Sequence, residues 1–422
     1  MPTAQVSGSS SKLSFSGIKN CRICSSSLEF FMDFGRMPRA NAFLLSAEFE
    51  SEYFFNLQAA FCAVCGLVQL VEQPPPHALF HEKYPFFTGS SKRMKEHFEQ
   101  WAEEVMRNYL PSPDSFVVEI GSNDGTLLAP FAQKGIRHLG IDPSANVAEK
   151  ARNCGVQTWC GFFNEDLARR IVAEFGQADA FFAANVFCHI PDLHTVLAGI
   201  ERLLKPSGLA ILEDPYLGDV IQKLSYDQIY DEHVYLFSIA SLTTLFKKYG
   251  LEVFRIEPQW THGGSMRYYV GHIGKRPVSK QVEEMRFKEK MAKLHSAETY
   301  QLFRKRCEES KDKLISVLRE IKQKGQRVAG YAATSKSTTV INYCGINAEL
   351  IEGIYDTTPA KQGRYSPGAH IPILPYEDFS KTYPDYALLF GWNHAQEIMD
   401  KEKEFRQAGG RWLLYVPEVR IF

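Results

Sequence analysis

Several features that would place this chain in a particular class are absent from its 422 residues. No run of eighteen apolar residues occurs, so the sequence predicts no membrane-spanning helix. The formal net charge is −1, which offers no excess of basic residues to nucleic acid or to an acidic membrane surface. Residues 1–18 are rich in serine and lack a continuous apolar core, so they predict a disordered tail rather than a signal peptide. We expect a cytoplasmic monomer without a nucleic-acid or membrane partner.

Cysteine is scarce and unevenly placed. Four of the nine cysteines form two C-x-x-C pairs, Cys21 with Cys24 and Cys62 with Cys65. The two-residue spacing lets both thiolates of a pair face one tetrahedral ion, and four thiolates leave no open coordination position. The pairs therefore predict a structural zinc ion in a reducing compartment, rather than a disulfide framework. Unligated thiols and a thioredoxin-like redox pair are the alternatives.

Around the cysteine pairs, regular patterns are few. The segments Asp33–Gly35 and Pro38–Asn41 are predicted to be loops, and Tyr53–Phe61 alternates apolar and polar residues as a strand does. After a rigid connection at Pro74–Pro76, the hydroxyl-rich segment Thr88–Ser91 is either a lid over a ligand or a plain loop. In the helix that follows, Met94, His97, Phe98 and Trp101 are expected to lie on one face and to pack in the core.

The dinucleotide fingerprint G-x-G-x-x-G is missing from the first predicted cofactor loop. The chain instead reads E-x-G-x-x-x-G from Glu119 to Gly125, with Asn123 in place of the middle glycine, and this resembles the S-adenosylmethionine (SAM) loop of class I methyltransferases. Asp142 follows the next predicted strand and would present a carboxylate to ribose hydroxyls. A dinucleotide loop and a turn without a ligand are the alternatives. The residues expected to contact the cofactor are Glu119, Gly121, Asn123, Asp124, Gly125, Asp142, Asn185 and Ser90.

Strand and helix patterns alternate through the middle of the chain, which predicts an α/β fold with a doubly wound parallel sheet. A terminal hairpin fits a class I methyltransferase sheet better than a dehydrogenase sheet, so it favours SAM. The predicted strands are Phe116–Ile120, Arg137–Ile141, Gln157–Cys160, Ala178–Ala184 and Gly208–Glu213, with Leu251–Glu257 and Met266–His272 as the hairpin.

Two histidines stand near the expected cofactor. His189 follows the fourth predicted strand, where ligands gather in such sheets. His233 belongs to a cluster with Tyr230 and Glu232 that combines a phenol, a carboxylate and an imidazole. The cluster indicates a base with an orienting partner, whereas a histidine held in the core is the plainer reading.

The C-terminal part predicts a second nucleotide-type fold. A long charged helix is predicted over Ser279–Lys324, and it precedes the strands Arg327–Tyr331, Ile351–Asp356 and Tyr386–Phe390. Its expected apolar face consists of Met285, Met291, Leu294, Leu302, Leu314 and Leu318. The loop after the first of these strands opens a helix and suits a pyrophosphate, although it is not a Walker loop. A docking domain without a ligand is the alternative. The expected substrate-binding residues are Tyr331, Ser335, Lys336, Ser337, Thr338, Asp356, Lys361, Arg364 and Asn393.

Taken together, these motifs resemble the three-domain, zinc-containing SAM-dependent sugar C-methyltransferases, which act on nucleotide-linked keto-deoxysugars. The matching stretches are the two C-x-x-C pairs, Tyr84–Ser91, Glu119–Leu128, Asn185–His189, Glu213–Tyr216, Tyr230–Ser238, His262–Ser265 with Arg267, and Gly330–Thr339. The resemblance implies a zinc domain over 19–75, a SAM domain over 76–275 and a Rossmann-like sugar-nucleotide domain over 276–422. It also implies that Tyr84, His189, Tyr230, Glu232 and His233 are active-site residues.

Methylation at carbon requires a nucleophilic carbon, which a sugar provides once a proton beside its ketone has been removed. We expect His233, with a pKa near neutral and oriented by Glu232, to take that proton. Tyr230, Tyr84 and His189 are expected to donate to the enolate or to relay the proton. The substrate would be a nucleotide keto-deoxysugar, for example a dTDP-linked one. Three alternatives stay open: an epimerase or remodelling relative that uses the same enolate, a NAD-dependent sugar dehydrogenase, and a zinc-containing binding module without turnover.

Overall fold

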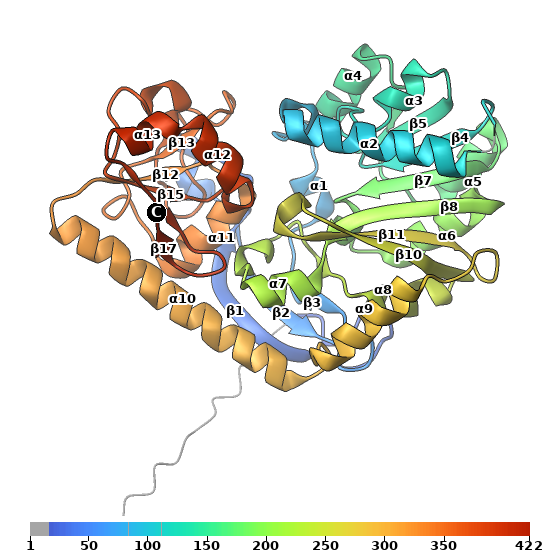
Figure 1. Cartoon of the computed structure of the whole chain (residues 1–422), viewed down its shortest axis with the longest axis horizontal. Coiled ribbons are helices and arrows are strands. Elements are labelled where there is room, and N and C mark those ends of the chain that lie inside the picture. The colour runs from blue at the N-terminus through green and yellow to red at the C-terminus, as the bar shows by residue number, and fades with distance from the viewer. Residues whose placement is uncertain (1–16, 83, 111) are drawn as a thin grey trace, which may run out of the picture.

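The computed structural model describes residues 17–82, 84–110 and 112–422, so most of the tail predicted over residues 1–18 lies outside the described residues. The described residues form three β-sheets, arranged as two α/β lobes joined by a smaller N-terminal sheet (Figure 1). In this part of the chain, no helix combines the length and apolarity needed to cross a membrane.

The largest sheet holds the predicted cofactor strands. Its members are β4 (Phe116–Ile120), β5 (Arg137–Asp142), β6 (Thr158–Cys160), β7 (Ala178–Ala184), β8 (Leu204–Pro215), β10 (Leu251–Gln259) and β11 (Ser265–His272). The strand order is β10-β11-β8-β7-β4-β5-β6. Strands β4 to β8 pair in parallel, whereas β11 and β10 run antiparallel at one edge. This mixed sheet confirms the class I methyltransferase fold that the terminal hairpin predicted.

Helices cover both faces of this sheet (Figure 1). They are α2 (Lys92–Tyr109), α3 (Ala129–Gln133), α4 (Ala145–Asn153), α5 (Glu165–Phe175), α6 (Leu193–Leu203) and α8 (Ile239–Lys247). Helix α7 (Leu217–Lys223) packs instead in the core that includes β1 (Glu29–Pro38), β2 (Phe54–Phe61) and α10 (Ala297–Gln323). On one face, α2 buries Phe98 and Trp101 against the strands. On the other face, α6 buries Leu197 and Ile200. Because both faces are covered, the carboxyl ends of the parallel strands are the edge where polar ligands can bind.

The N-terminal sheet joins the two lobes. It consists of β1 (Glu29–Pro38), β2 (Phe54–Phe61), β3 (Val68–Leu70) and β9 (Tyr235–Leu236) in that order. Strand β9 comes from the lobe built on the seven-stranded sheet, which is the predicted SAM domain and is called the SAM lobe below. It pairs with β3, so that Gln69 lies opposite Tyr235. Because β9 directly follows the Tyr230–His233 cluster, this pairing anchors the cluster against the N-terminal segment.

The C-terminal lobe is built on a six-stranded sheet of order β14-β13-β12-β15-β16-β17. Its strands are β12 (Val328–Tyr331), β13 (Ile354–Asp356), β14 (Ile373–Pro375), β15 (Tyr386–Leu389), β16 (Arg411–Leu414) and β17 (Arg420–Ile421). Among the described residues of this sheet, β17 pairs antiparallel with β16, and all other strand pairs are parallel. Helix α11 (Ser335–Cys344) follows β12, and α12 (Ala395–Lys401) and α13 (Lys403–Gln407) follow β15. The parallel core confirms a Rossmann-like C-terminal fold.

The prediction of one long helix over Ser279–Lys324 is wrong. The segment forms two helices, α9 (Lys280–Met291) and α10 (Ala297–Gln323), and the chain turns between them at Lys293, which has φ +54°. Met291 and Leu302, predicted on the apolar face, are exposed. Leu314 and Leu318 are buried as predicted, on a face of α10 that also carries Tyr300, Phe303, Cys307 and Ile321. Leu302 lies twelve residues before Leu314, which is about 120° away around the helix axis, so it points away from that face.

The prediction of a loop at Asp33–Gly35 is also wrong, because these residues lie within β1. The pairing of β1 with β2 shifts register between Asp33 and Arg36, and Gly35 has φ +81°. Such a bulge places a glycine and a polar residue inside a strand, which looks like a turn in the sequence. Phe34 next to them is buried, with its ring 5.0 Å from that of Tyr343 on α11.

Candidate active site

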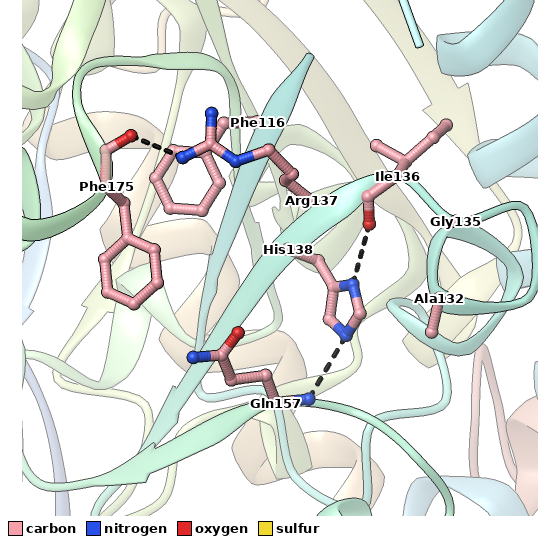
Figure 2. Close-up of a pocket in the computed structure, with 8 residues that line it drawn as sticks. All are labelled: Phe116, Ala132, Gly135, Ile136, Arg137, His138, Gln157 and Phe175. Carbon is pink, nitrogen blue, oxygen red and sulfur yellow. Dashed lines mark hydrogen bonds between the residues drawn. The ribbon is translucent and has the colours of Figure 1, made fainter. Parts of the chain in front are cut away.

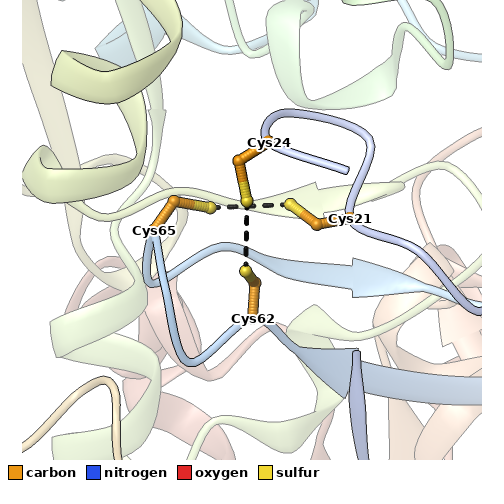
Figure 3. A group of neighbouring side chains, drawn as sticks. All are labelled: Cys21, Cys24, Cys62 and Cys65. Atoms are coloured by element: carbon orange, nitrogen blue, oxygen red, sulfur yellow. Dashed lines mark hydrogen bonds between the residues drawn. The ribbon is translucent and has the colours of Figure 1, made fainter. Parts of the chain in front are cut away.

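The four cysteines converge at one end of the N-terminal sheet, as predicted (Figure 3). The Sγ atoms of Cys21 and Cys65 are 3.5 Å apart, those of Cys24 and Cys62 are 3.4 Å apart, and all four lie within 4.8 Å of one another. Zn–S bonds of about 2.3 Å in a tetrahedral site place sulfur atoms about 3.8 Å apart. The donor set therefore fits one zinc ion with a closed shell.

The predicted cofactor loop leaves β4 and is shaped by positive φ angles. Gly121 has φ +59°, and a Cβ atom there would lie 2.2 Å from Cγ2 of Val186, so no other residue fits. Asn123 has φ +50° and donates its backbone N–H to Asp142 Oδ2 over 2.9 Å. The backbone N–H of Ser144 donates to the other oxygen of Asp142 over 2.8 Å. These bonds fix the Asp142 carboxylate at the end of β5.

Burial raises the pKa of Glu119 well above its ordinary value, and the charges of Asp142 and Asp124 raise it further. Its Oε2 atom is buried and lacks a hydrogen-bond partner among the described residues. Asn185, at the end of β7, likewise has a buried, unpartnered Oδ1 atom and φ +54°. Unpaired buried acceptors and left-handed backbone at strand ends are typical of ligand sites. Both features lie where the sequence predicted the cofactor.

The segment predicted as a lid or a plain loop lies on the cofactor loop. The backbone N–H of Thr88 donates to Asn123 Oδ1, and that of Gly89 donates to Asp124 Oδ2, both over 2.9 Å. Asn123 Nδ2 donates in return to the Phe86 carbonyl over 3.1 Å. Ser90 is exposed, and its hydroxyl donates to the Phe87 carbonyl. The geometry favours the lid over the plain loop, with Thr88 and Gly89, rather than Ser90, making the contacts.

The His233 ring is held from both nitrogens. Nδ1 lies 2.7 Å from the backbone carbonyl of Gln228 and Nε2 lies 2.9 Å from the Tyr230 hydroxyl. A carbonyl accepts only, so Nδ1 carries the proton and Nε2 accepts from Tyr230. The expectation that Glu232 orients His233 is wrong, since the Glu232 carboxylate bonds Asn41 and Tyr84 instead. A backbone carbonyl five residues earlier, that of Gln228, takes that role, which residue types alone do not reveal.

His189 lies beside His233, with ring centroids 5.1 Å apart. Burial lowers the pKa of His189 to about 3, and its Nε2 atom has no hydrogen-bond partner among the described residues. Burial also lowers the pKa of His233 well below its ordinary value, and His189 and His262 lower it further. Both imidazoles are therefore neutral at neutral pH, and the expected near-neutral pKa of His233 is corrected. A neutral ring offers one donor and one acceptor to a substrate.

Glu232 connects three segments that are distant in the sequence. Its Oε1 atom accepts from Asn41 Nδ2 over 2.7 Å, and its Oε2 atom accepts from the Tyr84 hydroxyl over 3.3 Å. Burial raises the pKa of Glu232, and the adjacent Asp231 carboxylate raises it further. Tyr84, Tyr230, Glu232, His189 and His233 thus gather at the carboxyl end of the sheet, as the sequence predicted. Asn41 was predicted only as part of a loop.

A second buried network lies next to this group and was missed in the sequence. Glu213 on β8 lies opposite Arg267 on β11, and the Arg267 guanidinium donates to Glu213 Oε2 over 2.7 Å. His97 Nε2 and Thr261 Oγ1 lie 2.9 and 2.8 Å from Glu213 Oε1. Burial alone would raise the pKa of Glu213, but the bond from His97 and the charge of Arg267 hold it at about 2. The sequence signal for this network was the pair of opposite charges, Glu213 and Arg267, on two strands that could have been predicted to be neighbours.

In the C-terminal lobe, α11 begins at the predicted phosphate loop. Lys336, in its first turn, is 7% exposed, and its Nζ atom lies 3.5 Å from Asn393 Oδ1 and 5.4 Å from the centroid of the Trp392 ring. Burial lowers the pKa of Lys336 to about 8, although the charge of Asp227 opposes this. A buried amine with one long hydrogen bond at a helix N-terminus suits an anion.

The other predicted substrate residues contribute to the shape of this loop. Thr334 caps α11 by accepting from the Ser337 backbone N–H. Asp356 accepts from the Ala333 backbone N–H, and Lys361 donates to the Ala333 carbonyl, both over 2.7 Å. Ser335 and Thr338 donate to Asn41 and to the Ala40 carbonyl, Arg364 donates to the Phe43 carbonyl, and Tyr331 donates to Glu402. Of the predicted set, Lys336 and Asn393 are therefore the pair that the fold brings together with polar atoms available to a ligand.

Asp227 joins the two lobes and was not predicted. Its Oδ2 atom accepts from Trp392 Nε1 over 2.6 Å and from the Tyr415 hydroxyl over 2.7 Å. The Trp392 ring closely approaches Gly263, where a Cβ atom would lie 2.1 Å from a ring carbon. The only sequence signal was the glycine pair at 263 and 264.

A pocket at the other end of the SAM lobe is a separate feature (Figure 2). It lies where β4 and β5 begin, whereas the cofactor loop lies where β4 ends. Its polar groups are already paired: Arg137 donates to the Phe175 carbonyl, and His138 lies between the Ile136 carbonyl and the Gln157 backbone N–H. The pocket therefore offers no free catalytic group.

Comparison with known protein families covers most of the chain. Residues 21–80 match a zinc binding domain, residues 94–256 match a methyltransferase domain, and residues 260–417 match a C-methyltransferase C-terminal domain. The three matches follow the same order as the three sheets.

Two curated proteins are similar to this chain, and the solved structures similar to it include a methyltransferase of Synechocystis. C-methyltransferase NovU of Streptomyces niveus is 34% identical over 410 residues, which span 96% of this chain and 97% of that protein. Sterol 4-C-methyltransferase strm-1 of Caenorhabditis elegans is 26% identical over 158 residues, or 36% of this chain and 45% of that protein. Magnesium protoporphyrin IX methyltransferase of Synechocystis superposes with a TM-score of 0.31 at 17% identity, covering 42% of this chain and 82% of that structure.

Proposed function

The chain belongs to the family of three-domain, zinc-containing C-methyltransferases, and from this premise we propose that it methylates a carbon atom of a nucleotide-linked keto-deoxysugar. The observation that carries the proposal is the Tyr230–His233 pair. His233 Nε2 accepts a hydrogen bond from the Tyr230 hydroxyl, with 2.9 Å between nitrogen and oxygen, and the neutral ring of His189 lies beside it. This arrangement suits the removal and holding of a carbon-bound proton.

The reaction requires that a C–H bond beside the ketone break before a C–C bond forms. SAM, when bound, supplies an electrophilic methyl group. In our proposal the proton from carbon ends on His233 Nε2, and Tyr230 relays it through the hydroxyl that bonds this nitrogen. The electron pair of the C–H bond moves into the enolate, whose oxygen accepts a hydrogen bond from neutral His189. The enolate carbon would then form its new C–C bond with the methyl group of SAM, while the methyl carbon–sulfur bond breaks and its electron pair stays on the sulfur of the leaving thioether.

The remaining site residues bind and orient the reactants. Asp142 would accept from the ribose hydroxyls of SAM, because both of its oxygens are fixed by backbone N–H groups at the end of β5. Lys336 and Asn393 would hold the phosphates of the sugar nucleotide at the start of α11. The four cysteines would hold a structural zinc ion.

Mass spectrometry of nucleotide keto-deoxysugars incubated with SAM and the protein tests the proposal. We expect one of them, for example a dTDP-linked sugar, to gain the mass of one methylene group. A second incubation in heavy water without SAM separates the rivals: deuterium exchange without later methylation would identify an epimerase or remodelling enzyme. Reduction of NAD in the absence of SAM would identify a dehydrogenase instead. If no sugar is methylated, exchanged or oxidised, the proposal is wrong.

A further inference from the structure

The loop that follows β1 carries a side chain of the N-terminal segment into the candidate active site. Asn41 donates from Nδ2 to Glu232 Oε1 over 2.7 Å, and its Oδ1 atom accepts from the Ser335 hydroxyl over 3.0 Å. Glu232 belongs to the SAM lobe and Ser335 opens α11 of the C-terminal lobe. One amide thus connects the proposed chemistry with the proposed phosphate loop.

The neighbouring backbone is fixed on three sides, so the position of Asn41 is well determined. The backbone N–H of Ala40 donates to Asp231 Oδ2 over 3.0 Å, and the Ala40 carbonyl accepts from Thr338 Oγ1 over 2.8 Å. The Arg39 guanidinium donates to the Ala78 carbonyl over 2.6 Å. Both lobes therefore form hydrogen bonds with residues 39–41, so a movement of either lobe would displace Asn41.

The amide also has an electrostatic effect on Glu232. Burial and the Asp231 charge raise the pKa of Glu232, whereas the bonds from Asn41 and Tyr84 and the charge of Lys361 lower it. Tyr230, from the same turn, also lies within electrostatic range of this carboxylate. Because Asn41 donates to a carboxylate oxygen, its bond favours the ionised form.

We propose that Asn41 is a positioning residue of the methyl-transfer reaction. It fixes the Glu232 carboxylate relative to Ser335, and Glu232 in turn holds the hydroxyl of Tyr84, the phenol expected to donate to the enolate, so that Asn41 links substrate binding by the C-terminal lobe to the reacting groups of the SAM lobe. The inference rests on the proposed function. It gives the zinc-bearing segment a direct part in the active site, in addition to its role in stability.

The test compares Asn41→Ala with Asn56→Ala, because Asn56 also donates to a glutamate, Glu72, over 2.9 Å, but on the exposed surface of β2. We expect Asn41→Ala to lower kcat by about 10- to 100-fold, since small displacements of a catalytic group have effects of that size. The acid limb of its pH–kcat profile should move to higher pH, because Glu232 loses a donor to its ionised form and its pKa rises. Asn56→Ala should leave both kcat and the pH–kcat profile unchanged.

Zinc content and SAM affinity, measured on the same samples, show whether the variants are folded. A folded Asn41→Ala protein whose kcat and pH profile match those of Asn56→Ala would overturn the inference. A double-mutant cycle with Glu232→Gln gives a second readout, and additive losses would also contradict it. If the wild-type chain methylates no sugar, the proposed function fails separately. An infrared titration then tests the effect of Asn41 on Glu232 independently of activity. Asn41→Ala should raise the pKa of the Glu232 carboxyl.

Discussion

The backbone carbonyl of Gln228 lies 2.7 Å from His233 Nδ1 and thereby fixes the tautomer of the imidazole. The side-chain amide of the same Gln228 donates to the His262 carbonyl, so one residue connects the turn of the SAM lobe with the loop before β11. Because Nδ1 is occupied by its own proton, Nε2 is the nitrogen that can accept another. This relationship leads to the first prediction.

Replacing His233 by Ala should lower kcat by about 10²- to 10⁴-fold, as expected when a general base is removed. Tyr230→Phe should have a smaller effect of the same sign, because the hydroxyl that bonds Nε2 is lost while the nitrogen stays. The measurement is the rate of deuterium exchange at the carbon beside the ketone, which isolates proton removal from methyl transfer.

The matched control for His233 is His138→Ala, since His138 bonds the Ile136 carbonyl and the Gln157 backbone N–H near the pocket of Figure 2, away from the cofactor loop. We expect it to retain wild-type exchange. Equal exchange rates in folded His233→Ala and His138→Ala proteins would remove His233 from the reaction.

Lys336 should make the binding of a nucleoside diphosphate sensitive to pH. Its pKa is lowered to about 8 by burial, so its positive charge is present below pH 8 and is lost as the pH rises through that value. Affinity for dTDP should therefore fall by up to about tenfold between pH 7 and pH 9. Calorimetric titration with dTDP measures this directly.

A Lys336→Arg variant supplies the control for that titration, because guanidinium stays charged over the whole range. We expect its affinity for dTDP to be flat between pH 7 and pH 9. The charged and titratable groups that interact with Lys336 are Asp227, His233, His262 and His394. An identical pH dependence in Lys336→Arg would assign the effect to one of those groups instead.

Arg267 should matter for stability more than any surface arginine of the same lobe. Its guanidinium is the buried partner of Glu213, and Arg267→Met would leave that carboxylate charged and poorly compensated. We expect a loss of about 3–5 kcal/mol in the free energy of unfolding, measured by urea denaturation. Arg169→Met, which breaks exposed pairs with Glu165 and Asp166 on α5, should cause a much smaller loss, because exposed ion pairs contribute little to stability. Similar losses in both variants would contradict the prediction.

The same network predicts how acid destabilises the fold. The pKa of Glu213 is lowered from 4.5 to about 2 in the folded chain, so its stabilising contribution is fully present above pH 4.5. That contribution is lost as the pH falls from 4.5 towards 2, because the unfolded chain then binds the proton first. In Arg267→Met, this part of the acid dependence should become smaller.

Removal of the zinc ligands should affect the whole chain, because β3 of the zinc-bearing segment pairs with β9 directly after His233. Cys62→Ser should abolish zinc binding, lower the melting temperature by about 5–10 °C and weaken methyl transfer. Cys154→Ser, at an exposed free cysteine, is the matched control and should change none of these. Metal analysis and thermal denaturation measure the outcome, and retention of zinc by Cys62→Ser would contradict a four-cysteine site.

Local patterns in the sequence were sufficient for most of the sheet of the SAM lobe. Ala178–Ala184 was predicted with the bounds that β7 has, because a buried parallel strand is a continuous apolar run between turns. The Asp33–Gly35 strand and the break at Lys293 were not predicted, since a bulge and a single left-handed residue leave only a turn-like pattern or none at all.

By itself, the sequence determined which groups of chemistry this chain possesses: paired thiols at zinc spacing, a glycine loop after a buried strand, and a phenol, carboxylate and imidazole within four residues. Only the tertiary structure decided which partners they have. His233 is oriented by Gln228 and not by Glu232, and Glu232 is bonded by Asn41, which lies 191 positions away. Covalent spacing determines which residues can share a turn, whereas contacts between distant segments depend on how three sheets pack, and no local pattern encodes that.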